Sequence, residues 1–343
     1  MRIKLKKLAD QVIVITGASS GIGLTTAEMA ADGGARVVLS SRNEADLQKA
    51  ADRIRKSGGR ATFFVADVAD AAAMERLAEH AVREFGGFDT WVNNAGLGLY
   101  GRTVDVPLAD KRRLFDVNFW GVVHGCRAAV PHLRRRGGAL VNIGSMVSDL
   151  ASPLLGIYSA SKHAVKGYTD ALRMELEEEG APIAITLVKP SAINTPFIEH
   201  AANYMEAEPE FPPPIYAPEA VAEAILKCAV RATREITVGG AGRMITAMGR
   251  IAPRLTDLYM ETTMFEQQKR EEPPHTPDAL YRPQRDGRRR GPSQRMTLQR
   301  SAYTRAALSD AGRVLPFVAA GLAVAAGIRS MSQRQQSAAA PPR

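Results

Sequence analysis

The stretch Val12-Ile-Val-Ile-Thr-Gly-Ala-Ser-Ser-Gly-Ile-Gly23 decides the fold of this chain. Its first five residues are all β-branched, as is typical of a strand buried on both faces. Three glycines then permit a tight turn whose backbone can approach a ligand, and a helical pattern over residues 21–32 begins at once. Strand, glycine-rich turn and helix in this order indicate a dinucleotide-binding turn, because the unpaired N–H groups at a helix start attract phosphate.

The remainder of residues 1–240 repeats this alternation of short apolar runs and longer helical patterns. Such alternation implies parallel strands with right-handed crossovers, and strands that are apolar throughout imply helices on both faces. We therefore predict an α/β fold, a doubly wound parallel sheet of about seven strands. The expected strands are 12–16, 36–41, 61–66, 90–93, 139–144, 183–188 and 235–238. The expected helices are 21–32, 43–57, 70–86, 108–117, 118–135, 156–179 and 217–231.

Composition and charge limit the classes of function. The chain has 343 residues, is 45% hydrophobic, and carries two cysteines without metal-ligand spacing, so we expect a globular cytoplasmic protein without a metal site. Its net charge of +9 arises in the C-terminal part: residues 1–239 hold 28 Lys+Arg and 28 Asp+Glu, whereas residues 240–343 hold 17 and 8. A neutral body argues against a nucleic-acid groove in it.

The chain divides by composition after the last expected strand. Residues 1–240 form the predicted catalytic domain, and the proline-rich stretch 191–216 within it is a predicted substrate lid. Residues 241–268 are expected to be helical. The Pro/Arg-rich segment 269–300 has few apolar side chains, so we expect it to be disordered or loosely attached. The tail 301–343 contains an apolar run whose bounds are 314–328.

The apolar run leaves several alternatives open. At 1.5 Å per residue its fifteen residues span about 22 Å, which is less than the roughly 30 Å of a bilayer core. It either inserts in or lies on a membrane, docks on the body of the protein, or binds a partner helix.

Three side chains predict the chemistry. Tyr158 and Lys162 lie four residues apart and so share one face of a helix, and Ser145 follows a strand. A neighbouring ammonium favours phenolate, so we expect Lys162 to lower the pKa of Tyr158 and to let it pass protons at neutral pH. Together with the glycine-rich turn, these residues predict a redox site.

With Asn93-Asn-Ala-Gly96 between the turn and the serine, the chain resembles the short-chain dehydrogenase/reductase family over about residues 8–240. The resemblance implies a single Rossmann-type domain and a nicotinamide dinucleotide cofactor. It implies Tyr158 as the general acid in reduction and base in oxidation, and Lys162 as the residue that lowers its pKa and binds the nicotinamide ribose. Ser145 would hydrogen-bond the carbonyl oxygen, and Asn118 would hold a water that links Lys162 to solvent.

The cofactor residues follow from the same resemblance. Asp67 matches the position that holds the adenine ring, although it could instead cap the helix that begins near residue 70. The second strand ends without an acidic residue, and Arg42 could pair with a 2′-phosphate beside Ser41, so we predict NADP(H) over NAD(H). The alternative is a solvated arginine. The predicted cofactor-binding residues are Gly17, Ser19, Ser20, Gly21, Ile22, Gly23, Ser41, Arg42, Asp67, Val68, Asn94, Ala95, Gly96, Tyr158, Lys162, Pro190, Ile193 and Thr195.

One departure from the family stands at Lys189-Pro190-Ser191, where the family usually has glycine after the proline. The substrate walls are mostly apolar, which suits a lipophilic ketone, aldehyde or secondary alcohol but equally suits ordinary packing. These walls are Leu97, Leu99, Tyr100, Met146, Val147, Phe197, Tyr204 and Phe211.

The resemblance also implies association through the helices 118–135 and 156–179, which in this family form a four-helix contact, so we expect a homodimer or homotetramer. Val122, Val123, Ala129, Val165 and Leu172 suit that contact or packing on the sheet. Two further functions stay open. One is a cofactor-binding protein whose basic tail docks on an anionic membrane or polymer; the other is a membrane-associated lipid reductase.

Overall fold

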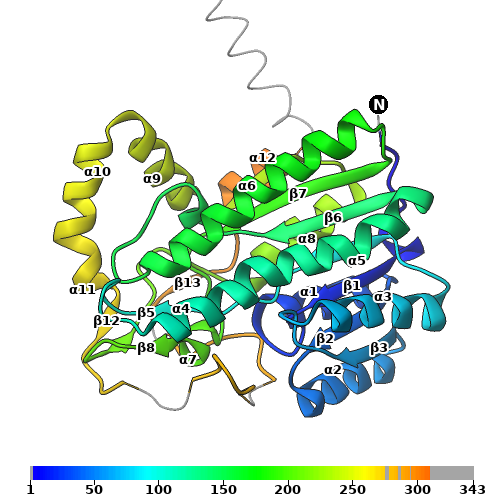
Figure 1. Cartoon of the computed structure of the whole chain (residues 1–343), viewed down its shortest axis with the longest axis horizontal. Coiled ribbons are helices and arrows are strands. Elements are labelled where there is room, and N and C mark those ends of the chain that lie inside the picture. Colours follow the sequence, from blue (N-terminus) through cyan, green and yellow to red (C-terminus); the bar gives the residue numbers. More distant parts are fainter. Residues whose placement is uncertain (1–2, 275–277, 285–286, 294, 310–343) are drawn as a thin grey trace, which may run out of the picture.

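A computed structural model of the chain describes residues 3–274, 278–284, 287–293 and 295–309. Its centre is a sheet of seven parallel strands in the order β11-β7-β6-β4-β1-β2-β3 (Figure 1). The predicted doubly wound sheet is thereby confirmed. Its strands are β1 (Val12–Thr16), β2 (Arg36–Ser41), β3 (Arg60–Val65), β4 (Thr90–Asn93), β6 (Gly138–Ile143), β7 (Ile183–Pro190) and β11 (Glu235–Val238).

Helices cover both faces of this sheet. Along β1, Ile13 and Ile15 pack on one face while Val12 and Val14 pack on the other, because successive side chains of a strand alternate. In Figure 1, α5 and α6 cross in front of the sheet and α8 lies behind it. The first face carries α1 (Gly21–Asp32), α2 (Glu44–Lys56) and α8 (Pro218–Val230). The second carries α3 (Ala71–Phe85), α4 (Leu108–Phe115), α5 (Gly121–Arg136) and α6 (Gly156–Glu178).

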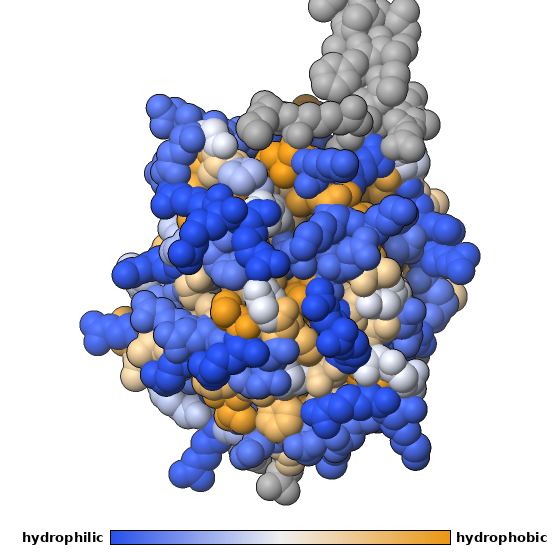
Figure 2. Space-filling view, turned by 90° about the vertical axis from the view of Figure 1, so that its right-hand side faces the viewer, coloured by the Kyte–Doolittle hydropathy of each residue, from blue (hydrophilic) through white to orange (hydrophobic). Residues whose placement is uncertain are grey.

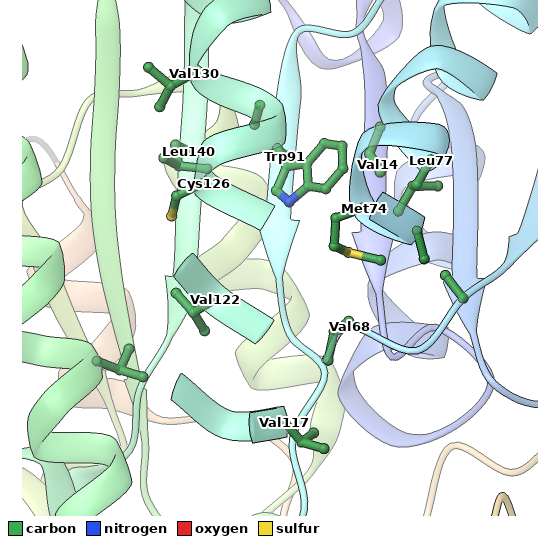
Figure 3. Packing of buried hydrophobic residues seen from close by; sticks show 14 of the residues in the cluster. Val14, Val68, Met74, Leu77, Trp91, Val117, Val122, Cys126, Val130 and Leu140 are labelled. Atoms are coloured by element: carbon green, nitrogen blue, oxygen red, sulfur yellow. The ribbon is translucent and has the colours of Figure 1, made fainter. Parts of the chain in front are cut away.

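The core under α3 and α5 centres on Trp91 of β4, which is fully buried. Figure 3 shows its ring between Met74 and Leu77 of α3 on one side and Cys126 of α5 on the other. The indole N–H donates to the Asn93 side chain at 2.7 Å, so this large ring is buried without leaving an unpaired donor.

Three two-stranded pairings attach the stretch 191–216 to the rest of the protein. This stretch also contains α7 (Phe197–His200). Each pairing joins this stretch by backbone hydrogen bonds to a segment that is distant in the sequence. The stretch is therefore attached to the body at three places. The pairings join β5 (Leu99–Tyr100) to β8 (Ala202–Asn203), β9 (Glu208–Pro209) to β12 (Lys269–Arg270), and β10 (Ile215–Tyr216) to β13 (Thr297–Leu298).

The expected helical extension forms a hairpin beside the sheet (Figure 1). It consists of α9 (Gly240–Ile251), α10 (Pro253–Tyr259), a π-helical turn η4 (Met260–Met264) and α11 (Phe265–Gln267). Pro253 begins α10, where its missing N–H costs no helical hydrogen bond. The last helix within the described residues, α12 (Ala302–Leu308), packs near β11.

The segment 269–300 differs from the loosely attached linker that its composition predicts. Four of its residues pair, two in β12 and two in β13, and Leu280 is only 1% exposed. Its backbone and arginines contact the body, which composition alone does not reveal. The apolar run 314–328 lies outside the described residues. Within the described ranges, no helix combines the length and the apolar character needed to cross a bilayer.

The sequence suggested five apolar side chains on α5 and α6 for a subunit contact. Most of them face the sheet instead. Val122, Ala129 and Val165 are buried in the core of this chain. Large apolar side chains that do reach the surface of this layer are Trp120 (49% exposed) and Met174 (57% exposed). The face to the right of Figure 1 is mainly hydrophilic, with apolar residues in small separate patches (Figure 2).

Candidate active site

The glycine-rich turn joins β1 to α1 at the carboxyl end of the sheet. Gly17 has φ of 65°, in the left-handed region, and a Cβ at Gly23 would lie 2.1 Å from the Gly17 carbonyl oxygen. Only glycine fits such a turn. Asn94 holds it from below, because its Nδ2 donates to the Thr16 carbonyl oxygen at 2.9 Å. The loop is therefore fixed by the Asn-Asn-Ala-Gly segment at the end of β4.

Ser145, Tyr158 and Lys162 meet at one cavity, as their spacing predicts. Ser145 follows β6 and caps the short helix η3 (Met146–Ser148), while Tyr158 and Lys162 lie in the first two turns of α6. The Lys162 Nζ lies 5.7 Å from the centre of the Tyr158 ring and donates to the Ile143 carbonyl oxygen at 2.9 Å. A phenol, a hydroxyl and an amine thus line the same volume.

The pKa values of this group depart from the prediction. Burial raises the pKa of Tyr158 to about 12, although a hydrogen bond with Ser145 works in the opposite direction and part of the ring is exposed in the cavity. Burial also lowers the pKa of Lys162 to about 8. The net shift of the Tyr158 pKa is therefore upward, opposite in direction to the shift expected from a neighbouring ammonium, because burial of the phenol is its largest cause. The role of Lys162 in setting this pKa stays a prediction.

Asn118 lies in a π-helical turn, η2 (Asp116–Trp120), that connects α4 to α5. The sequence predicts two helices that meet at this residue, and the structure has one helical run with a π turn, a feature frequent at functional sites. The Asn118 Oδ1 accepts from the Leu97 N–H at 2.8 Å, and its Nδ2 donates to the Leu97 carbonyl oxygen at 3.0 Å. A Cβ on Gly96 would lie 3.4 Å from this Oδ1 and 3.6 Å from the Lys162 Nζ, so both side chains approach one point.

A cavity of about 180 Å³ extends from the glycine-rich turn to the end of β2. Most of the predicted cofactor residues line it. Gly23 instead lies inside α1, and Pro190, Ile193, Tyr158 and Lys162 line the adjoining cavity. The lining residues from the prediction are Gly17, Ser19, Ser20, Gly21, Ile22, Ser41, Arg42, Asp67, Val68, Asn94, Ala95, Gly96 and Thr195.

Asp67 is held by two donors at the edge of this cavity. It accepts from the Ala69 N–H at 3.0 Å and from the Arg113 Nη2 at 2.5 Å. Burial alone would raise the pKa of Asp67, but these hydrogen bonds and the charges of Arg113 and Arg42 hold it below its ordinary value. The helix α3 is capped by Asp70, whose side chain accepts from the Ala72 N–H, so Asp67 does not cap it.

Arg42 contacts the chain's own C-terminal segment. Its guanidinium donates to the carbonyl oxygens of Ala279 and Leu280. Burial lowers the pKa of Arg42 from its ordinary value, partly offset by Asp67. Arg113 donates through Nε to the same Leu280 oxygen at 3.1 Å. Sequence reasoning missed Arg113, because nothing in its helix distinguishes it from a surface arginine.

A second cavity, of about 540 Å³, adjoins the first and is lined by Ser145, Tyr158 and Lys162. Of the predicted walls, Tyr100, Met146, Val147, Phe197 and Phe211 line it. Leu97 lines the first cavity, Leu99 is buried beneath, and the Tyr204 hydroxyl contacts Asp110 at the surface. The hairpin after β11 supplies walls that the sequence prediction missed: Met244, Ile245, Met248, Tyr259, Met260 and Met264. The methionine pairs 244/248 and 260/264 are each four residues apart, and this spacing could have indicated an apolar helix face.

The serine that replaces a family glycine after Pro190 is accommodated by two other glycines. A Cβ on Gly239 would lie 2.4 Å from the Ser191 Oγ, and one on Gly242 would lie 2.2 Å from it. The preceding Lys189 is buried and pairs with Asp149 at 2.6 Å, which ties β7 to the turn after Ser145. The Ser191 side chain therefore occupies space that a side chain at position 239 or 242 would otherwise fill.

Comparisons with known proteins agree with this fold. The family profile described as short chain dehydrogenase matches residues 11–205. An uncharacterized oxidoreductase, YxnA, of Bacillus subtilis is 46% identical over 310 residues, which are 89% of this chain and 87% of that protein.

Two solved structures share the fold. A short chain dehydrogenase/reductase from Burkholderia phymatum in complex with NAD has a TM-score of 0.63 at 26% identity, covering 79% of this chain and all of that one. An alcohol dehydrogenase from the archaeon Thermococcus sibiricus complexed with 5-hydroxy-NADP has a TM-score of 0.59 at 26% identity, covering 66% of this chain and 95% of that one. Neighbours of this fold thus bind dinucleotides of both kinds.

Proposed function

This chain belongs to the short chain dehydrogenase family of oxidoreductases, and we propose that it transfers a hydride between NADP(H) and a carbonyl or secondary alcohol group of a lipophilic compound. One observation carries the proposal: Ser145, Tyr158 and Lys162 line a single cavity that adjoins the cavity of the glycine-rich turn. A dinucleotide lying across both would bring its reactive ring to the proton donor.

The residues present fit a nicotinamide dinucleotide. The first backbone N–H groups of α1 point to where a diphosphate would bind, although that of Gly21 donates to the Arg288 carbonyl oxygen in this structure, and Lys162 and Thr195 line the inner part of the site. When bound, the cofactor supplies or accepts the hydride. Tyr158 gives its proton to the carbonyl oxygen, Ser145 donates a hydrogen bond to that oxygen, and Lys162 places positive charge beside the phenol as negative charge develops.

A protonated Tyr158 suits the role of acid in the reduction of a carbonyl, and the phenolate would be the base in the reverse direction. With a pKa near 12, the phenol carries its proton at neutral pH and is prepared to act as an acid. Oxidation of an alcohol needs the phenolate, which is rare at that pH. Asn118, next to Lys162, would then serve the return of a proton to the tyrosine after each turnover.

Preference for NADP(H) rests on the end of β2. Ser41, Arg42 and Asn43 line the cavity there and none is acidic, so the end of β2 presents no carboxylate that would repel a 2′-phosphate. The Arg42 guanidinium could pair with that phosphate in a charge-assisted contact. Comparison of kcat/KM for NADPH and NADH tests this, and a clear preference for NADH would remove Arg42 from the role.

A lipophilic substrate is supported by the size and lining of the second cavity. At about 540 Å³ it is large, and the walls from the hairpin after β11 are rich in methionine. Methionine side chains are flexible and apolar, so such a wall adapts to bulky molecules of different shape. Nothing in the described part of the chain favours the alternative in which tail docking, rather than turnover, is the main output.

Association into a homodimer or homotetramer remains a proposal. The exposed Trp120 and Met174 are the apolar side chains on this layer that a partner subunit would cover. Light scattering of the purified protein tests it, and a monomer at micromolar concentration would contradict it.

A screen of ketones and alcohols tests the proposed function directly. Aliphatic, aromatic and steroid-like compounds would be incubated with NADPH or NADP⁺ while the absorbance of the reduced nicotinamide is followed. We expect turnover with bulky apolar carbonyls and NADPH. Failure of all of them, with a protein that folds, would contradict the proposal.

A further inference from the structure

Part of the C-terminal segment lies across the dinucleotide cavity. We call residues 278–284 and 287–291 the strap. Ala279, Pro283 and Gln284 of the strap line the same cavity as the glycine-rich turn, and Leu280 is buried against the body. In Figure 1 this gold trace runs between α7 and α2. Phe197 and His200 of α7, and Asn43 at the start of α2, line the cavity.

Carbonyl oxygens of the strap accept from donors of the cofactor site. The Gly21 N–H, the first of α1, donates to the Arg288 oxygen at 2.9 Å. Arg42 donates to Ala279 and Leu280, as described above. The Asn43 Nδ2, at the start of α2, donates to the Gln284 oxygen at 2.8 Å. The strap therefore presents a row of partial negative charges to the positions where phosphate oxygens would bind.

Three consecutive arginines fasten the strap to three different helices. Arg288 pairs with Glu199 of α7 at 2.6 Å, Arg289 pairs with Glu28 of α1, and Arg290 pairs with Glu219 of α8 at 3.3 Å. These three glutamates lie outside the residues that line the cavity. The side chains of the strap thus hold it in place while its backbone contacts the donors.

We propose that the strap is an internal competitor of the dinucleotide: its carbonyl oxygens and the phosphates of NADP(H) bind the same donors and exclude one another. The inference rests on the proposed function, since it takes the cavity to be the dinucleotide site. Two observations support exclusion. Gly21 and Arg42 already donate to the strap, and the covered cavity of about 180 Å³ is smaller than the roughly 300 Å³ at which ligand sites begin.

Competition of this kind lowers the apparent affinity for the cofactor. Only the fraction of molecules with the strap released can bind, and the apparent Kd rises as that fraction falls. Anything that loosens the arginine contacts therefore tightens binding. A lid that closes over a bound cofactor would behave in the opposite way, which makes the sign of the effect decisive.

The first test removes the three arginines. We would measure the Kd for NADPH by its fluorescence in the full-length variant Arg288→Ala/Arg289→Ala/Arg290→Ala. The matched control is Arg134→Ala/Arg135→Ala/Arg136→Ala, an equal loss of charge at the end of α5. We expect the strap variant to bind roughly five- to tenfold more tightly than the wild type, and the control to be unchanged. Equal or weaker binding by the strap variant overturns the proposal.

The second test uses the unaltered protein and does not depend on how a variant folds. Trypsin cuts after arginine, and cleavage after Arg288, Arg289 and Arg290 can be followed by mass spectrometry. We expect NADPH to accelerate these cuts severalfold, because binding releases the strap. Protection by NADPH, or no change while NADPH binds, overturns the proposal.

These tests separate the strap from the proposed function. Neither uses turnover, so a protein that binds NADPH through strap release but reduces no carbonyl would refute the function and leave the strap. A protein that reduces carbonyls with identical NADPH affinity in all three forms would refute the strap alone. Absence of dinucleotide binding in every form would refute both.

Discussion

Replacing Lys162 by methionine should stabilise the protein at neutral pH while it removes activity. Lys162 is 4% exposed, and burial lowers its pKa from 10.5 to about 8. At pH 7 the amine is charged in both folded and unfolded states, so the folded state carries the full cost of burying that charge. Methionine keeps the long side chain and removes the charge.

The size of the effect follows from the shift in pKa. The difference between 10.5 and 8 is about 2.5 units, which at 1.36 kcal/mol per unit is about 3 kcal/mol. Loss of the hydrogen bond to the Ile143 oxygen costs about 1 kcal/mol at every pH. We therefore expect the variant to be more stable by about 2 kcal/mol at pH 7.

The sign of the pH dependence provides the sharper test. A lysine whose folded pKa is lowered costs stability fully below that pKa, and the cost fades as pH rises toward the unfolded pKa. The advantage of Lys162→Met should shrink by about 2 kcal/mol between pH 7 and about pH 10. Urea denaturation of both proteins at the two pH values measures it, and taking the difference cancels the titration of tyrosines and cysteines. A variant that is less stable than the wild type by the same amount at both pH values would refute the reasoning.

Three further predictions concern the cofactor, the proton and the packing. Arg42→Ala should lower the ratio of kcat/KM for NADPH to that for NADH by roughly tenfold, since release of the strap affects both cofactors alike; an unchanged ratio would exclude Arg42 from phosphate binding. The initial rate of alcohol oxidation should rise steadily from pH 7 to about pH 10, because the Tyr158 phenolate becomes more abundant toward its pKa of about 12, and a plateau near pH 7 would contradict that. Gly242→Ala should lower the free energy of unfolding by roughly 1 to 2 kcal/mol through contact with the Ser191 Oγ, and Ser191→Gly in the same chain should restore it; thermal denaturation of the single and double variants measures this.

The fold could be predicted from sequence because its strands are short, apolar and regularly spaced by helical patterns. The same regularity brings the proposed catalytic residues to one cavity, since the Tyr158/Lys162 spacing on one helix and the position of Ser145 after β6 leave little freedom. The strap could not be predicted. Its contacts with the donors of the cofactor site use backbone carbonyl oxygens, which every residue has, and the glutamates that pair with its arginines are far away in the sequence. Its proline and arginine content alone therefore suggested a loose linker.

The balance between burial and charge that sets the pKa of Tyr158 could not be predicted from the sequence either. A lysine four residues from a tyrosine predicts a lowered tyrosine pKa, whereas burial of the Tyr158 phenol in the structure raises it. The methionine wall was missed for a related reason: α9 and η4 read as ordinary amphipathic helices, and only their position beside the cavity gives their apolar face a role. In both cases the deciding quantity is what surrounds a residue in space.

The central claim is that Tyr158 passes a proton to a carbonyl beside a bound dinucleotide. Its most direct test is the Tyr158→Phe variant, which keeps the ring and removes only the hydroxyl. NADPH binding followed by fluorescence should stay within about twofold of the wild type, while turnover of the best ketone should fall by at least about a thousandfold. Turnover retained within tenfold of the wild type would contradict the claim.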